Sequence, residues 1–220
     1  MTDTRLPPEL MALRIDPKAP LVIVDVDEVL ALFMRAFEGF VERRGFEMRI
    51  DRFALFQNIY RPGATEHLDL ISGKLLFEEF FEHHAADMDV APGATDALAK
   101  LAQRASIVVL TNAPAQGRAG RARWLIKHGL PYSMVVNTGA KGPAVAALAA
   151  RTRGPAAFID DLLPHLDSAA VAAPAVARFQ TVADERLRPL AFCAPDRHRR
   201  IDAWPDLGEA IAEALGLKPR

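Results

Sequence analysis

The sequence predicts an α/β fold in which a parallel sheet lies between two layers of helices. Short runs that are apolar at every position alternate along the chain with segments of helical periodicity. Such runs are typical of strands that are buried on both faces of a parallel sheet. The alternation stops between residues 31 and 90, where only helical patterns occur. We therefore expect a three-layer core with a small all-helical segment inserted after its first strand.

The predicted strands are short apolar runs rich in β-branched residues. The first is LVIVD at 21–25, directly after Pro20. Comparable runs recur later in the chain, the last of them weaker: SIVVLT (106–111), YSMVV (132–136), AAFID (156–160) and RFQTV (178–182). Their length, five or six residues, favours strands over helices.

Helical segments follow the predicted strands. Apolar residues spaced three or four positions apart mark 94–104, 121–129 and 142–151, and a further helix is expected near 206–216. Gly129 is expected just past the end of its helix, where a left-handed backbone favours glycine. Strands and helices in alternation indicate a parallel sheet.

Residues 31–90 interrupt this alternation. The segments ALFMRAFEGFVERRG (31–45) and LLFEEFFEHH (75–84) carry apolar side chains at helical spacing, and the stretch holds at least half of the 12 phenylalanines. It is too long for an ordinary connection between a strand and a helix. We expect residues 1–30 and 91–220 to form the core and residues 31–90 a small separate domain.

Composition limits the classes of function. The 220 residues are 50% apolar, with 27 basic residues against 28 acidic ones and a formal net charge of −1. This balance favours neither nucleic acid nor a membrane surface as a partner, and no apolar run approaches the roughly 20 residues of a membrane-spanning helix. The N-terminus carries no secretory apolar region. The single cysteine, Cys193, excludes a disulfide framework, and we expect it to be buried. A soluble, cytoplasmic protein is predicted.

Polar residues follow four of the predicted strands. They are Asp25 and Asp27, Thr111 and Asn112, Lys141, and Asp160 and Asp161. The carboxyl ends of parallel strands face the ligand crevice, so these side chains should converge. Four carboxylates need a cation beside them, and oxygen ligands suit Mg²⁺. The hydroxyl and ammonium groups are donors, which predicts an anion next to the metal and the outline of a phosphoryl-transfer site.

These residues also form an ordered set of motifs. D-V-D-E-V (25–29), V-V-L-T-N (108–112), G-A-K-G-P (139–143) and F-I-D-D (158–161) occur in that order. The set resembles the four motifs of the haloacid dehalogenase-like (HAD-like) superfamily. The resemblance spans residues 21–161 and implies a Rossmann-like core. It also implies that residues 31–90 are a helical cap of the first type, inserted between the first and second motifs.

The resemblance implies a catalytic role for each motif. Asp25 would be the nucleophile that forms an aspartyl-phosphate, and Asp27 the general acid and base. Thr111 and Lys141 would hold the phosphoryl oxygens, and Asn112 would help to position the group. The retained second aspartate points to the phosphatase and phosphotransferase branches.

The implied metal site consists of carboxylates. Asp25, the main-chain carbonyl of Asp27 and Asp160 would bind Mg²⁺, with Asp161 binding directly or through a water. The residue after the second aspartate is commonly glycine in the phosphatases, whereas here it is Glu28. A carboxylate at the entrance to the site would repel anionic substrates or bind a cationic group on the substrate.

The sequence therefore predicts a Mg²⁺-dependent phosphatase that hydrolyses a small phosphorylated metabolite. An intramolecular phosphotransferase, such as a sugar-phosphate mutase, is the alternative enzyme. A non-catalytic member of the family that binds phosphate is the alternative outside enzymes. The chain could act as a monomer or a homodimer, and the sequence does not name its substrate.

Overall fold

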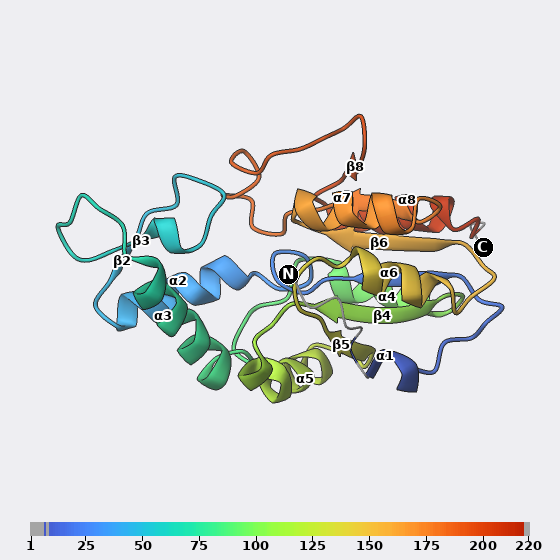
Figure 1. Cartoon of the computed structure of the whole chain (residues 1–220), viewed down its shortest axis with the longest axis horizontal. Helices are drawn as coiled ribbons and strands as arrows, with labels where there is room; N and C mark the ends of the chain where they lie inside the picture. The colour runs from blue at the N-terminus through green and yellow to red at the C-terminus, as the bar shows by residue number, and fades with distance from the viewer. Residues whose placement is uncertain (1–6, 8, 218–220) are drawn as a thin grey trace.

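The computed structural model describes residue 7 and residues 9–217. Within these residues the main sheet has six parallel strands in the order β5-β4-β1-β6-β7-β8; Figure 1 labels β4, β5, β6 and β8 of this sheet. Their bounds are Leu21–Val24 (β1), Ser106–Thr111 (β4), Ser133–Val136 (β5), Ala156–Asp160 (β6), Ala177–Gln180 (β7) and Arg199–Arg200 (β8). The predicted α/β fold with a parallel sheet is confirmed.

The central strands place alternate side chains in two apolar cores. In β1, Val22 and Val24 belong to the larger core, whereas Leu21 and Ile23 belong to the smaller one. All four side chains are fully buried. A strand covered on both faces has no position left for a polar residue, which explains its unbroken apolar run.

Helices cover both faces of the sheet. The larger core is covered by α4 (Ala94–Ala102), α5 (Arg118–Lys127) and α8 (Trp204–Ala214). The smaller core is covered by α6 (Gly142–Ala149), α7 (Leu163–Ala172) and Leu10 of the short α1 (Glu9–Ala12). The four predicted helices are confirmed, each within a few residues of its expected bounds.

The strand order reverses at β1. β4 and β5 lie on one side of β1, and β6, β7 and β8 lie on the other. Ligands of such sheets bind outside the carboxyl ends of the strands at this reversal. Val24 pairs with Val109 of β4 and with Ile159 of β6. The register therefore brings the residues that follow these three positions to the same edge of the sheet.

Residues 31–90, here called the inserted segment, lie on the side towards which the strands point (Figure 1). The segment contains α2 (Phe33–Arg43), β2 (Glu47–Met48), the 3₁₀ helix η1 (Phe56–Asn58), β3 (Ile59–Tyr60) and α3 (Leu70–His83). The expectation of an all-helical segment is wrong, because β2 and β3 form an antiparallel pair. Strands of two residues are too short to show an alternating pattern in the sequence.

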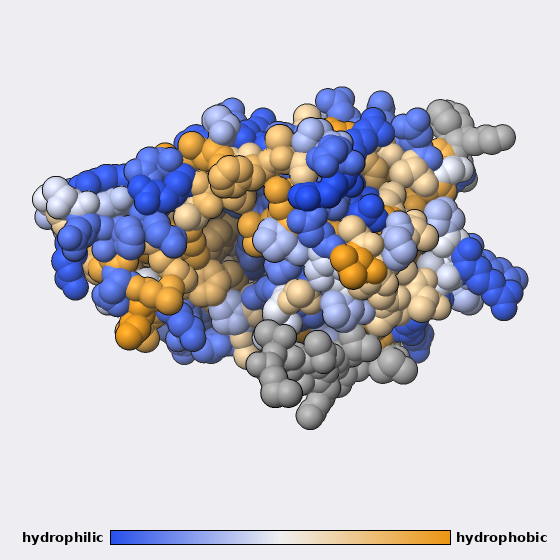
Figure 2. All heavy atoms as spheres, turned by 45° about the horizontal axis from the view of Figure 1, so that its top comes forward, coloured by the Kyte–Doolittle hydropathy of each residue, from blue (hydrophilic) through white to orange (hydrophobic). Residues whose placement is uncertain are grey.

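Phenylalanines join the two helices of the inserted segment. Phe33 and Phe37 of α2 contact Phe80 of α3 edge to face, with ring centroids 5.6 and 5.4 Å apart. Edge-to-face contacts of this kind favour one relative placement of the two rings. In Figure 2, hydrophilic residues cover the outer end of the segment, and apolar residues gather where it meets the core.

The two chain connections between the core and the inserted segment are paired with each other. Ala31 and Val90 form an antiparallel bridge. The amide of Ala91 donates to the carbonyl of Leu30 at 2.7 Å, and the amide of Leu32 donates to the carbonyl of Asp89 at 2.9 Å. The chain therefore leaves and re-enters the core at adjacent points.

Three further features differ from expectation or add to it. Neither α7 nor β8 is predicted, since α7 consists largely of alanine and other small residues and β8 consists of two arginines. Cys193 is exposed, so the expectation of a buried thiol is wrong. No helix in the described part of the chain is long and apolar enough to cross a membrane.

Candidate active site

Asp25 occupies the first position after β1, at the reversal of strand order. Its amide donates to the carbonyl of Ile159 at 3.0 Å, which continues the pairing with β6. Its side chain is 8% exposed. The ammonium of Lys141 lies 2.7 Å from Asp25 Oδ1 and 2.7 Å from Asp160 Oδ2. Lys141 directly precedes α6, as predicted, and is 1% exposed.

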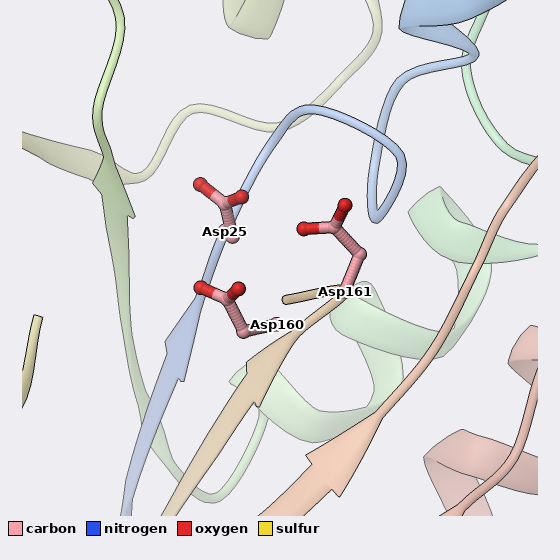
Figure 3. Close-up of side chains that lie close together, drawn as sticks. All are labelled: Asp25, Asp160 and Asp161. Atoms are coloured by element: carbon pink, nitrogen blue, oxygen red, sulfur yellow. The ribbon is translucent and has the colours of Figure 1, made fainter. Parts of the chain in front are cut away.

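Three carboxylates meet beside this lysine. Oxygens of Asp25, Asp160 and Asp161 lie within 4.8 Å of one another, and Figure 3 shows the three groups at the ends of β1 and β6. Burial, reinforced by the negative charges of Asp160 and Asp25, raises the pKa of Asp161 well above its ordinary value. Burial also raises the pKa of Asp160, although the Lys141 ammonium opposes this shift. The cluster therefore carries more negative charge than Lys141 alone offsets.

Lys141 is held in its charged form. Burial disfavours the ammonium, but the carboxylates of Asp160 and Asp25 outweigh burial and raise the pKa of Lys141 above its ordinary value. A fixed ammonium between two strand ends is a suitable donor for an anionic group.

Thr111 supplies a second donor at this edge. It ends β4, is fully buried, and its Oγ1 has no hydrogen-bond partner among the described residues. A buried hydroxyl without a partner is uncommon in proteins and indicates a group that awaits a ligand or a water. Thr111 therefore fits the predicted role as a donor to a phosphoryl oxygen.

Asn112 is part of a small network that fixes the loop before Lys141. Its Nδ2 donates to the carbonyl of Gly139 at 2.8 Å, and its Oδ1 accepts from Asn137 Nδ2 at 2.9 Å. Asn137 also donates to Gly139 at 3.3 Å. The sequence analysis did not identify Asn137. Both amides hold the turn from which Lys141 enters the site.

Asp27 points to a partner on α5. Arg121 Nη2 lies 2.7 Å from both carboxylate oxygens of Asp27. The Arg121 side chain is fully buried, whereas that of Asp27 is 27% exposed. Burial raises the pKa of Asp27, and the Arg121 charge opposes this rise. A raised pKa suits a group that must carry a proton to a leaving group.

The sequence analysis missed Arg121. Its one sequence signal is its position three and four residues before Trp124 and Leu125, which places a charged side chain on the apolar face of α5. A buried charge needs a partner of opposite sign. The partner, Asp27, lies 94 residues away in the chain, so the pattern alone could not name it.

Glu28 lies differently from the sequence expectation. It is 4% exposed, and its oxygens accept from the amides of Met34 at 2.7 Å and Asp184 at 3.0 Å. Its backbone is left-handed, with φ 54°, which turns the carboxylate into the protein. The expectation of a carboxylate at the entrance, repelling or binding a substrate, is therefore corrected: Glu28 joins the start of α2 to the loop at Asp184.

Burial raises the pKa of Glu28 to about 7, against the opposing effect of its two backbone hydrogen bonds. Because Glu28 links the first turn of α2 to the loop after β7, it contributes to the position of the inserted segment on the core.

Residues 19–147, more than half of the chain, match the sequence model of a family described as 5' nucleotidase, deoxy (pyrimidine), cytosolic type C protein. The chain belongs to this family. The match includes the first three motifs, from Asp25 to Lys141. No curated protein sequence shows a significant match to the chain.

Solved structures of HAD-like proteins share the fold of this nucleotidase-family protein. A HAD-like protein from Agrobacterium tumefaciens has a TM-score of 0.59 and 18% identity, covering 88% of this chain and 97% of that one. Magnesium-bound YfnB from Bacillus subtilis has a TM-score of 0.61 and 14% identity, covering 88% and 99%. CbbY from Rhodobacter sphaeroides, in complex with xylulose-1,5-bisphosphate, has a TM-score of 0.54 and 18% identity, covering 86% and 96%.

The family and the fold agree with the motifs. The protein is a hydrolase of the HAD-like superfamily, and its class of reaction is the hydrolysis of phosphoric monoesters.

Proposed function

We propose that the protein is a Mg²⁺-dependent phosphatase that hydrolyses a small phosphomonoester through an aspartyl-phosphate on Asp25. The observation that carries this proposal is the setting of the Asp25 carboxylate. It lies at the strand reversal, 2.7 Å from the Lys141 ammonium, on the same sheet edge as the unpartnered hydroxyl of Thr111. A nucleophile beside two fixed donors suits attack on a phosphoryl group.

The carboxylates present fit Mg²⁺. Asp25, Asp160 and Asp161 offer oxygen ligands within 4.8 Å of one another, which is the donor chemistry that Mg²⁺ prefers. Asp161 is surrounded by like charges, so a cation would relieve their repulsion. These three side chains, with the main-chain carbonyl of Asp27, are the ligands that we assign. When bound, the ion supplies positive charge that offsets the charge of the phosphoryl group.

The first half of the proposed reaction transfers the phosphoryl group to the protein. Asp25 attacks phosphorus, a bond forms between its carboxylate oxygen and phosphorus, and the bond from phosphorus to the leaving oxygen breaks. Asp27 gives its proton to the leaving oxygen, and the alcohol departs. Lys141 and Thr111 donate to the phosphoryl oxygens throughout.

The second half returns the protein to its starting state. Asp27, now a carboxylate, takes a proton from a water whose oxygen attacks phosphorus. The bond between phosphorus and Asp25 breaks, which releases inorganic phosphate. One water is consumed for each ester, and each aspartate ends in its original protonation state.

Nucleoside 5'-monophosphates, deoxypyrimidine ones among them, are the first substrates to test, because the description of the family is 5' nucleotidase, deoxy (pyrimidine). In this proposal the core, residues 1–30 and 91–220, binds the phosphoryl group. The inserted segment, residues 31–90, serves as a cap that faces the organic part of the substrate and excludes water. A cap of this kind favours small metabolites over phosphorylated proteins.

The experiment is a release assay for inorganic phosphate with deoxy- and ribonucleoside 5'-monophosphates and sugar phosphates, in Mg²⁺ and after chelation. We expect release that chelation abolishes and added Mg²⁺ restores. Isomerised sugar phosphate without phosphate release, seen by ³¹P NMR, would favour a mutase instead. Binding without turnover of any substrate would favour a non-catalytic protein.

The intermediate is tested with Asp27→Asn. This variant retains the nucleophile but has no base to activate water, so a phosphoprotein should accumulate from a substrate with a good leaving group. The phosphoryl group on the protein should be stable in acid and labile in base. The Asp25→Asn variant should carry no phosphoryl group. Absence of the phosphoryl group from the Asp27→Asn protein would contradict the aspartyl-phosphate.

A further inference from the structure

Arg121 is a fully buried charge to which the reaction above assigns no step. Besides Asp27, its guanidinium contacts the ring of Phe81, 5.1 Å from the centroid, and its Nη1 lies 3.9 Å from Met88 Sδ. Its Nε has no hydrogen-bond partner in the part of the chain that the structure describes. Among the described residues, Asp27 is therefore the one charged group that forms an ion pair with this buried guanidinium.

The three contacts come from different parts of the molecule. Asp27 follows β1 in the core, Phe81 belongs to α3 of the inserted segment, and Met88 belongs to the connection that returns to the core. Arg121 itself lies on α5 of the core. Its side chain therefore lies at the junction between the core and the inserted segment, next to the acid–base aspartate.

The packing at this junction is close. A Cβ added to Gly117 would lie 2.6 Å from Phe81 Cδ1, and one added to Gly120 would lie 3.0 Å from Ala85 Cβ. The backbone at the start of α5 therefore lies close to side chains at the end of α3 and just beyond it. Close-packed surfaces transmit displacement, so a shift of α3 moves Phe81 against the Arg121 guanidinium.

We infer that Arg121 is a positioning residue for Asp27, and that it ties the orientation of this carboxylate to the position of α3. The inference rests on the acid–base role proposed for Asp27. A carboxylate with both oxygens on one guanidinium nitrogen has a defined direction. Lysine can keep the charge at position 121 but not the planar group that lies against Phe81.

The leaving group of the substrate separates this role from a merely structural one. Protonation by Asp27 matters for a poor leaving group, such as an alkyl alcohol, and matters little for p-nitrophenolate, which departs unaided. Damage to folding or to phosphoryl binding slows both substrates alike. The readout is therefore the ratio of first-turnover rates for p-nitrophenyl phosphate and an alkyl phosphate, measured by rapid mixing.

We expect Arg121→Lys to slow the first turnover of the alkyl phosphate by roughly thirtyfold or more, and that of p-nitrophenyl phosphate by less than about threefold. The size of the first effect follows from the contribution of general acids to rates, which is about 10²–10⁴-fold. In an Asp27→Asn background the same substitution should produce no further change in the ratio. The inference would be overturned if Arg121→Lys slowed both substrates equally. It would also be overturned if Arg121→Lys changed the rate ratio as much in the Asp27→Asn background as it does alone.

Phe81→Leu tests the connection to the inserted segment and remains available if Arg121→Lys does not fold. It keeps apolar volume but removes the ring beneath the guanidinium, so the ratio should shift in the same direction by about fivefold or more. Phe77→Leu is the matched control. Phe77 lies on the same helix with its ring tilted against that of Phe81, the centroids being 4.6 Å apart, and in the described part of the chain the Arg121 guanidinium lies over the ring of Phe81 and not over that of Phe77. An unchanged ratio in Phe81→Leu, or an equal change in Phe77→Leu, would contradict the connection.

The two hypotheses fail in different ways. If Asp27→Asn itself leaves the ratio unchanged, the acid–base role of Asp27 is wrong. If Asp27→Asn changes the ratio but Arg121→Lys and Phe81→Leu do not, the positioning role of Arg121 is wrong and the proposed function stands.

Discussion

At the scale of single residues, the site depends on one lysine that faces two aspartates. Lys141 contacts Asp25 and Asp160 at 2.7 Å each, whereas Asp161 forms no ion pair with any residue that the structure describes. Removal of a negative charge from this cluster should therefore relieve repulsion, whereas removal of Lys141 should leave buried carboxylates uncompensated. Substitutions of the aspartates can then separate catalysis from folding.

Asp25→Asn removes the attacking charge and keeps the shape of the side chain. Turnover should fall by about 10³-fold or more, because no other oxygen in the site replaces the nucleophile. The free energy of unfolding should stay within about 1 kcal/mol of the original, since Lys141 keeps Asp160 as a partner. Steady-state kinetics and urea denaturation measure the two quantities. A variant with more than about a tenth of the original rate would show that Asp25 is not the nucleophile.

Thr111→Val should raise the stability of the protein while it lowers the activity. The hydroxyl is buried and has no hydrogen-bond partner within the described residues, so valine, which has the same shape, should raise the free energy of unfolding of the ligand-free protein by about 1 kcal/mol. The value of kcat/KM should fall by about 10²-fold, because a donor to the phosphoryl oxygens is lost. Thermal denaturation and kinetics give both values. A loss of stability would mean that Thr111 has a partner in solution.

The residues at or just after the ends of strands could be located from the sequence, because the end of an apolar run marks the edge of the sheet. Asp25, Thr111 and Asp160 were found in this way. Arg121 was not, since its partner depends on how α5 packs beside β1. The orientation of Glu28 was missed because a left-handed residue in this turn, which is not a glycine, has no local sequence signal.

At the scale of elements, α6 carries Lys141 into the site and packs against α7. Gly142, the first residue of α6, allows this contact: a Cβ there would lie 2.3 Å from the carbonyl oxygen of Ser168. Its amide donates to Ser168 Oγ at 3.1 Å. The position of Lys141 therefore depends on a glycine that touches a neighbouring helix.

Gly142→Ala should force α6 and α7 apart. We expect the free energy of unfolding to fall by about 2 kcal/mol, and turnover to fall as Lys141 shifts away from Asp25. Ala147→Ser on the same helix is the control and should change stability by less than about 0.5 kcal/mol. Chemical denaturation of both variants is the measurement. Equal stability of Gly142→Ala and the original would show that the two helices can separate freely.

The elements that could be predicted well from the sequence are those long enough to show a complete pattern of apolar residues. β1, β4 and β6 are buried on both faces, and α4 and α8 have a clear apolar face. The β2–β3 pair was missed because each strand has two residues. Its position comes from contacts with the rest of the inserted segment rather than from a local pattern.

At the scale of the whole molecule, ion pairs connect the inserted segment to the loop after β7. Arg35 of α2 contacts Asp184 at 3.3 Å, and Arg186 contacts Glu38 of α2 at 2.7 Å. Glu28 adds its buried hydrogen bonds to both sides of this junction. The exposed pairs each contribute little and are screened by salt, so apolar packing and Glu28 hold most of the arrangement.

Mg²⁺ should stabilise the entire fold through the acidic cluster. At a concentration 100 times its Kd, the ion should add about 2.7 kcal/mol to the free energy of unfolding and raise Tm. Asp161→Asn should shrink this gain. Because burial and like charges raise the pKa of Asp161, its ionisation at neutral pH opposes folding, so the metal-free variant should have the higher Tm. Thermal scans with Mg²⁺ and with chelator decide this, and an identical Mg²⁺ shift in both proteins would remove Asp161 from the ligands.

The paired connections at Leu30–Ala91 and Leu32–Asp89 have a topological consequence. For the core, the inserted segment is a closed loop whose ends lie side by side, so the strand edge does not depend on how many residues the loop contains. Exchange of residues 31–90 for another segment with adjacent ends would keep Asp25 and Asp160 in register. The segment can therefore vary in length and sequence without a change in strand register, provided that an aromatic side chain at the place of Phe81 still lies against Arg121 beside Asp27.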